Sequence, residues 1–374
     1  MPYDVPHAVS PSLWVLAWKR LLADRVAMVS LAIVAAFLLM MLLSGTGLIA
    51  KDWSREVGVN YAPPSLAGAD AESAAPSAAP TTGASSDASD EIPVVDPLAD
   101  ALAAIRGEAP KATSTESSAA EGQSVDPLAD VMADIKAKGT KADAVEARRS
   151  TLPFGGDKWG RDVLKKTIKG SETSIFVGLA AAVVATFLGT VFGAMSGYYG
   201  RWLDDIFNWF YSVFTSIPYL LLILAVAAVL QQKGTLTIIL ILGLTGWTGV
   251  FRLIRGEYLK HKGREYVQAA DAIGASNVRR MFVHIFPNIS HVVLVQLSIL
   301  TVAFIKSEVI LSFLGFGVPV DVVSWGSMLN EAQNELILGK WWQLAAAGTA
   351  MALLVTAFSL FTDALRDALD PKLK

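Results

Sequence analysis

Long stretches without a charged residue are the feature that most restricts the fold of this 374-residue chain. Residues 26–50 and 174–197 contain no Asp, Glu, Lys or Arg, and each is about as long as a helix that crosses a bilayer. Charged residues make up only 17% of the chain, which is low for a protein whose whole surface meets water. The sequence therefore predicts an all-α integral membrane protein and excludes an ordinary soluble domain.

Apolar runs along the chain predict six transmembrane helices. They occupy residues 26–50, 174–197, 217–230, 235–251, 289–317 and 342–362. A cleaved signal peptide is the competing interpretation of the first run, but its apolar core would be shorter and nearer the start of the chain. We therefore expect an uncleaved first span. Pro218 divides the third span from an aromatic stretch that we expect to lie at the membrane interface.

One further segment precedes the first span, and another precedes the five-helix core of residues 174–374. Residues 1–25 carry tryptophan, leucine and basic residues at nearly helical spacing. This pattern predicts an amphipathic helix on the membrane surface, the alternative being a disordered basic terminus. Residues 151–173 are polar, glycine-rich and basic, and form a segment that precedes the second span.

Residues 51–150 are predicted to be a long, largely disordered insertion of low complexity. Residues 65–90 consist mostly of small and polar side chains, which cannot bury a core. The string Val-Asp-Pro-Leu-Ala-Asp occurs twice, at residues 95–100 and 125–130. Because Asp followed by Pro is a good helix start, each copy predicts a short helix on a flexible tether. These helices either dock on a partner or have no separate role.

The distribution of basic residues predicts the orientation. With the N-terminus in the cytoplasm, the C-terminal tail and the loop of residues 252–288 also face the cytoplasm, and this loop holds seven Lys and Arg residues. Residues 51–173 would then lie outside, although residues 158–169 are basic. Long external regions are exempt from the positive-inside rule, so we keep this orientation.

The loop of residues 252–288 has the pattern of a helix, a glycine turn and a second helix. Residues 265–273 suit the first helix, Gly274 suits its left-handed end, and Ser276 suits the cap of the second helix. Pro287 is expected to break that second helix. The first helix would present a small, partly apolar surface to a partner protein, formed by Ala269, Ala270 and Ile273.

This loop resembles the Glu-Ala-Ala loop of ABC importer permeases, in the version found in dipeptide and oligopeptide permeases. Gln268-Ala269-Ala270, Gly274 and Phe286-Pro287 hold the positions of that motif. FGGDKWGRDVL, at residues 154–164, is similar to the family signature ahead of the second span. The strings WKRLLADRVAMVSLAIV, SEVILSFLGFGV, SWGSMLNEA and LRDALDP are also similar to family strings, so the resemblance covers about residues 14–50 and 152–371.

The resemblance implies a permease subunit of the bacterial inner membrane. With a second homologous permease it would form the path for di- or oligopeptides delivered by a periplasmic substrate-binding protein. Two separate ATP-binding subunits would bind ATP and magnesium, since this chain has no G-x-x-x-x-G-K-[ST] loop. The chain itself is then expected to bind no cofactor and to be no enzyme. Another solute such as nickel remains open, and an ion-coupled secondary transporter is the alternative from a different class.

The resemblance assigns the coupling to the ATP-binding subunits to the loop. The coupling residues would be Gln268, Ala269, Ala270, Asp271, Gly274, Ala275, Arg279, Arg280 and Pro287. Gln268 stands where the family has glutamate, and Asp271, three residues on, would replace the missing charge. Arg279 and Arg280 would lie on the rim of the contact.

Other candidate residues lie elsewhere in the chain. Lys306 and Glu308 interrupt the fifth span, so they would either line the translocation path or pair with another helix. Arg161, Trp325 and Gly326, on the external side, are candidates for contact with the substrate-binding protein. The sequence shows no metal or catalytic constellation, and its charge balance gives no indication of nucleic-acid binding.

Overall fold

The computed structural model describes residues 13–67 and 148–369. The two copies of the repeat and most of the predicted insertion lie outside the described residues. Every regular element in the described part of the chain is helical. The N-terminal helix α1 (Leu13–Ala23) buries Ala17 and Leu21 in a cluster with the end of the last helix, while Trp18 and Leu22 are exposed.

Four helical stretches are long and apolar enough to cross a membrane. They are α2 (Arg25–Gly45), α5 (Val163–Tyr199), the stretch Asn277–Phe313 that contains α12 (Phe286–Phe313), and α14 (Trp342–Leu369). Two bent pairs bring the number to six if each pair is one span. The described residues therefore contain the helices that the six predicted spans require.

The bent pairs explain the interruptions in the third and fourth apolar runs. α6 (Arg201–Thr215) and α7 (Tyr219–Leu230) meet at 88°, at the break that contains Pro218. α8 (Thr235–Thr245) and α9 (Thr248–Lys262) meet at 41°. The aromatic stretch before Pro218 is thus a helix bent away from α7, and its place at the membrane interface stays a prediction.

α5 begins well before the predicted second span. The Asp162 carboxylate accepts hydrogen bonds from the backbone N–H groups of Leu164 and Lys165, at 2.8 and 3.4 Å, and so caps the helix. Much of the polar segment of residues 151–173 is therefore the first turns of α5. A helix of 37 residues results, with a polar start and an apolar remainder.

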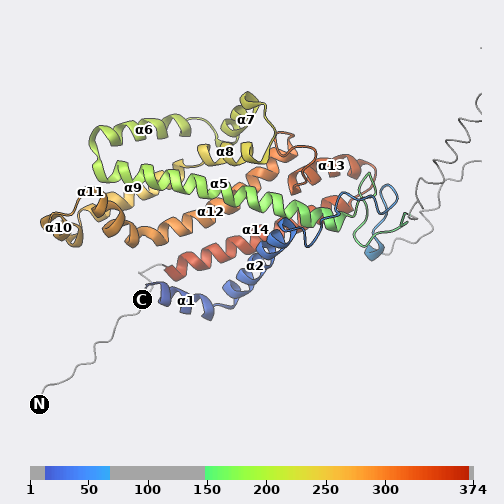
Figure 1. Ribbon diagram of the computed structural model, residues 1–374, viewed down its shortest axis with the longest axis horizontal. Coiled ribbons are helices and arrows are strands. Elements are labelled where there is room, and N and C mark those ends of the chain that lie inside the picture. The colour runs from blue at the N-terminus through green and yellow to red at the C-terminus, as the bar shows by residue number, and fades with distance from the viewer. Residues whose placement is uncertain (1–12, 68–147, 370–374) are drawn as a thin grey trace, which may run out of the picture. The chain divides into compact units, whose positions relative to one another are not determined.

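Glycine residues let α5 lie close to α9 and α12 (Figure 1). A Cβ atom placed on Gly189 would lie 2.6 Å from Val250 Cβ, and one on Gly178 would lie 2.4 Å from Ile305 Cγ1. Both distances are shorter than real carbon atoms approach one another. Small residues at helix contacts are how membrane helices gain close packing, because lipid gives no hydrophobic driving force between them.

We expect Gly189→Ala to separate α5 from α9 and to lower stability by about 1–3 kcal/mol, the usual cost of overpacking. Thermal unfolding of the detergent-purified protein measures the change. Gly256→Ala in α9 is the matched control, because a Cβ atom there has no neighbour within 4 Å. Equal melting temperatures for the two variants would contradict the close approach.

Short backbone pairings hold the segment after α2 beside the segment before α5. Gly58 pairs with Arg149, and Pro64 pairs with Leu152. The N–H of Gly58 also donates to the carbonyl of Gly160 at 2.9 Å. The chain on either side of residues 68–147 thus lies side by side.

Candidate functional site

The charged loop forms a short helical segment at one end of the bundle (Figure 1). α10 (Glu265–Ala272) follows α9, and α11 (Asn277–Arg279) leads through the π-helical turn η3 (Arg280–Ile285) into α12. We call residues 265–285 the α10–α11 segment. It contains most of the residues that the sequence assigns to coupling.

Gly274 ends α10 as the sequence predicts. Its φ is 79°, its N–H donates to the carbonyl of Asp271 at 2.8 Å, and the Ala275 N–H donates to the carbonyl of Ala270 at 3.0 Å. These two bonds form a Schellman motif, which satisfies the last carbonyl groups of the helix. Ser276 then caps α11 by accepting from the N–H of Arg279. The turn between the two helices is thereby fixed at both sides.

The prediction that Pro287 breaks the second helix is wrong. The chain stays helical from Asn277 to Phe313. The π-helical turn shifts the hydrogen-bond pattern just before the proline, so the N–H of Phe286 donates to the carbonyl of Met281. Pro287 then occupies the first turn of α12, where a missing N–H costs little. Its side chain is exposed.

One face of the α10–α11 segment packs against other helices of the same chain. Val267, Met281 and Ile285 are buried in a cluster with Tyr258 of α9, whose hydroxyl donates to the carbonyl of Met281 at 3.2 Å. Ala270 is only 4% exposed. The expectation that Ala270 belongs to a partner surface is therefore wrong, because its side chain faces its own chain.

The opposite face of the segment is exposed and apolar at its tip. Ile273 is 84% exposed, Val278 59% and Val283 58%. We call these three side chains the apolar tip. Among the residues predicted to couple to the ATP-binding subunits, those that are also exposed are Gln268, Ala269, Gly274 and Arg279. Ala275 is half-buried. Exposed branched apolar side chains on a rigid support suit contact with another protein.

Two charged residues predicted for the rim are already paired within the chain. Arg280 forms an ion pair with Asp271 and donates to Asn277 Oδ1 at 2.6 Å. Its guanidinium also lies over the ring of Tyr198, 5.9 Å from the centroid. Arg280 is thus not a free rim cation, and Asp271 does not simply replace the glutamate missing at Gln268. Tyr198, at the end of α5, is buried behind the exposed face, and no sequence motif predicts its contact with Arg280.

The two charged residues of α12 lie in different surroundings. Glu308 is fully buried, and the Ser312 hydroxyl donates to its Oε1 at 2.6 Å. Lys306 is exposed on another side of the helix. Ion pairs among the described residues do not include either side chain. Glu308 therefore does not line an open path in this structure, whereas Lys306 keeps the exposure that such a role requires.

The prediction that Trp325 and Gly326 contact a binding protein is wrong. Trp325 is fully buried at the start of α13 (Trp325–Ile337), and its indole N–H donates to the carbonyl of Thr167 at 3.1 Å. A Cβ atom on Gly326 would lie 2.5 Å from Ser312 Cβ. Both residues hold α13 against the bundle. Arg161 is half-buried, with its guanidinium over the ring of Trp53 at 5.5 Å.

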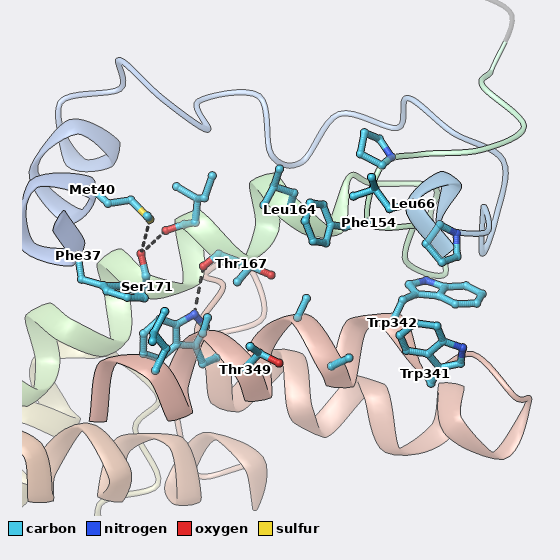
Figure 2. Close-up of a pocket in the computed structure, with 18 residues that line it drawn as sticks. Phe37, Met40, Leu66, Phe154, Leu164, Thr167, Ser171, Trp341, Trp342 and Thr349 are labelled. Atoms are coloured by element: carbon cyan, nitrogen blue, oxygen red, sulfur yellow. Dashed lines mark hydrogen bonds between the residues drawn. The ribbon is translucent and has the colours of Figure 1, made fainter. Parts of the chain in front are cut away.

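A cavity of about 510 Å³ lies beside this part of the chain. Figure 2 shows Trp341 and Trp342 at one end of it and Phe37 and Met40 at the other. Its walls come from α2, α5, α14 and the residues near Phe154. None of the described residues that line it is charged. The cavity suits an apolar group and offers no partner for the charged ends of a peptide.

A buried group of charged side chains connects the loop before α5 to the helices α5, α13 and α14. No sequence motif predicts this group. The Lys166 ammonium donates to Asp157 at 2.8 Å, to Glu331 of α13 at 2.6 Å and to Gln343 of α14 at 3.3 Å. Lys166 and Asp157 are almost fully buried. The carboxylates surround a lysine, and in the part of the chain that the structure describes no acidic or histidine cluster could hold a metal ion.

Glu335 of α13 lies beside this group without a hydrogen-bond partner for either carboxylate oxygen among the described residues. Its side chain is 2% exposed. Burial raises the pKa of Glu335 to about 7, and the nearby Lys166 ammonium offsets only part of this rise. The Glu331 and Asp157 carboxylates add to it.

We expect the free energy of unfolding to fall as the pH rises from about 4.5 to about 7. In this window Glu335 is ionised in the unfolded chain and protonated in the folded chain, so the folded state binds more protons. Above pH 7 both states are ionised and the loss is complete. Glu335→Gln should remove this part of the pH dependence. Melting temperatures of both proteins between about pH 4.5 and about pH 8 test it, and equal slopes would contradict it.

Comparison with known proteins identifies the family. Residues 12–64 match the model of the N-terminal TM domain of oligopeptide transport permease C, and residues 189–374 match that of the binding-protein-dependent transport system inner membrane component. The chain is 38% identical over 221 residues to the dipeptide transport system permease protein of Bacillus subtilis, covering 59% of this chain and 69% of the relative.

Two oligopeptide permeases give similar matches. The oligopeptide transport system permease protein of Bacillus subtilis is 38% identical over 221 residues, covering 59% of this chain and 72% of the relative. That of Haemophilus influenzae is 34% identical over 219 residues, covering 59% and 70%. With the multi-pass helical architecture, these matches show that this chain is a member of the binding-protein-dependent inner-membrane permeases, in the group of dipeptide and oligopeptide ABC permeases.

Proposed function

We propose that this chain forms, with a second homologous permease, the translocation path for di- and oligopeptides delivered by a periplasmic substrate-binding protein. Two separate ATP-binding subunits bind ATP and magnesium and dock on the α10–α11 segment. The permease itself holds no cofactor and catalyses no reaction. The names of its relatives, which are dipeptide and oligopeptide transport permeases, support the substrate class, and family membership argues against a stand-alone secondary transporter.

The observation that carries the docking role is the apolar tip. Its side chains are 58% to 84% exposed although the opposite face of the same segment is buried in the bundle. A segment that only connected α9 to α12 would need no such apolar surface in water. Exposed Arg279 lies beside the tip in sequence and adds a charge to the surface.

The proposal places the α10–α11 segment in the cytoplasm. Seven basic residues between positions 252 and 288 support this side, because cytoplasmic loops are enriched in Lys and Arg. Both chain termini are then cytoplasmic, and α13 and the predicted insertion of residues 51–150 are periplasmic. Arg161 and Lys306 remain candidates for the binding-protein contact and the path, respectively.

Co-purification and reconstitution test the function together. The tagged chain is expected to purify with a second permease and ATP-binding subunits from its native membrane. Proteoliposomes of that complex should take up a labelled dipeptide or oligopeptide when ATP and loaded binding protein are present. Uptake driven by an ion gradient through this chain alone would contradict the proposal, as would uptake of nickel but of no peptide.

A further inference from the structure

Among the described contacts, Tyr198 at the end of α5 meets two cations, one just before the α10–α11 segment and one within it. The Lys262 ammonium lies 5.4 Å from the ring centroid of Tyr198, and the Arg280 guanidinium lies 5.9 Å from it. Lys262 precedes the segment, and Arg280 follows α11. A single aromatic ring thus contacts the chain on both sides of α10 and α11.

Hydrogen bonds also hold the hydroxyl and the backbone carbonyl of Tyr198. The Tyr198 hydroxyl donates to Asn277 Oδ1 at 3.1 Å, and Lys262 Nζ donates to the Tyr198 carbonyl at 2.6 Å. Arg280 donates to the same Asn277 oxygen at 2.6 Å. The side chain is 5% exposed, which strengthens contacts between a ring and a cation because water competes less.

The position of Tyr198 determines which helices these contacts connect. The α10–α11 segment is joined covalently to α9 and α12, but it reaches α5 only through non-covalent contacts. α5 packs along both α9 and α12, and its far end carries Lys166, which holds α13 and α14. α5 therefore connects the helices next to the segment with α13 and α14 at the opposite end of the bundle.

We propose that Tyr198 is a positioning residue that transmits movement of the α10–α11 segment to α5 during transport. This rests on the proposed function, because the movement comes from ATP-binding subunits docked on the segment. Lys262 before α10 and Arg280 after α11 both contact the ring, so the ring follows the segment when it moves. The hydroxyl bond to Asn277 sets the position of the ring and contributes less than the two cations.

The test uses the complete complex in proteoliposomes with loaded binding protein. Tyr198→Leu removes the ring and keeps an apolar side chain, and Tyr198→Phe removes only the hydroxyl. Tyr199→Leu is the matched control, because the Tyr199 ring packs edge-on against Tyr198 but takes part in neither cation–π contact. Three quantities are measured: the amount of ATP-binding subunit that co-purifies, the ATPase rate without binding protein, and the peptide transported per ATP hydrolysed.

We expect Tyr198→Leu to keep its ATP-binding subunits and its basal ATPase rate, and to lose about tenfold in peptide transported per ATP, since two cation–π contacts are gone. Tyr198→Phe and Tyr199→Leu should stay close to wild type. An unchanged ratio in Tyr198→Leu would overturn the proposal. Loss of the ATP-binding subunits would also overturn it, because Tyr198 would then only support the docking surface. If the wild-type chain binds no ATP-binding subunits, the proposed function itself fails, which is a separate result.

Discussion

Gly274→Trp is expected to abolish ATP-dependent peptide uptake while the protein still inserts and folds. Gly274 is exposed at the end of α10, and a Cβ atom there meets nothing within 4 Å in the chain. The indole therefore has room in the isolated permease and projects toward whatever covers the apolar tip. Its left-handed φ of 79° adds a strain of about 1–2 kcal/mol, too little to unfold a bundle of this size.

Gly274→Asn is the matched control for that strain. Asparagine adopts the left-handed conformation at lower cost than most residues, and its side chain is small. We expect near-normal uptake by this variant and wild-type amounts of both variants in the membrane. Uptake of labelled dipeptide into proteoliposomes, with immunoblotting of the chain, gives the comparison. Normal uptake by Gly274→Trp would show that no partner approaches this turn.

The sequence predicts the helices well because membrane spans follow from composition over long windows. The uncharged runs, the break at Pro218 and the turn at Gly274 each depend on local chemistry, and the structure contains all three. Pro287 is the local feature that leads to a wrong prediction, namely a break in the helix. A π-helical turn removes the cost of the proline, and hydrogen-bond register cannot be read from residue types alone.

The candidate site is predicted only in part, because the face of a short helix depends on what packs against it. The motif locates the α10–α11 segment but does not tell that Ala270 faces inward while Ala269 faces outward. It also misses Tyr198, which meets Arg280 from another helix. Trp325 shows the same limit, since a tryptophan after a polar loop fits either a partner surface or a buried anchor.

The largest stability effect is expected from Lys166→Met. Lys166 is 2% exposed and donates to Asp157, which is fully buried, and to Glu331. Removing one partner of a buried ion pair leaves the other charge without compensation and costs about 3–5 kcal/mol. We therefore expect little folded Lys166→Met protein in the membrane and a much lower melting temperature for the fraction that purifies.

Lys165→Met is the control that separates burial from charge. Lys165 is the preceding residue and pairs with Asp52 at 2.7 Å, but the two side chains are 38% and 49% exposed. An exposed pair contributes up to about 1 kcal/mol, so this variant should melt close to wild type. Adding Asp157→Asn to Lys166→Met should recover part of the loss, because the uncompensated carboxylate is then neutral. Equal melting temperatures for Lys165→Met and Lys166→Met would mean that the buried group does not hold the loop before α5, α13 and α14 together.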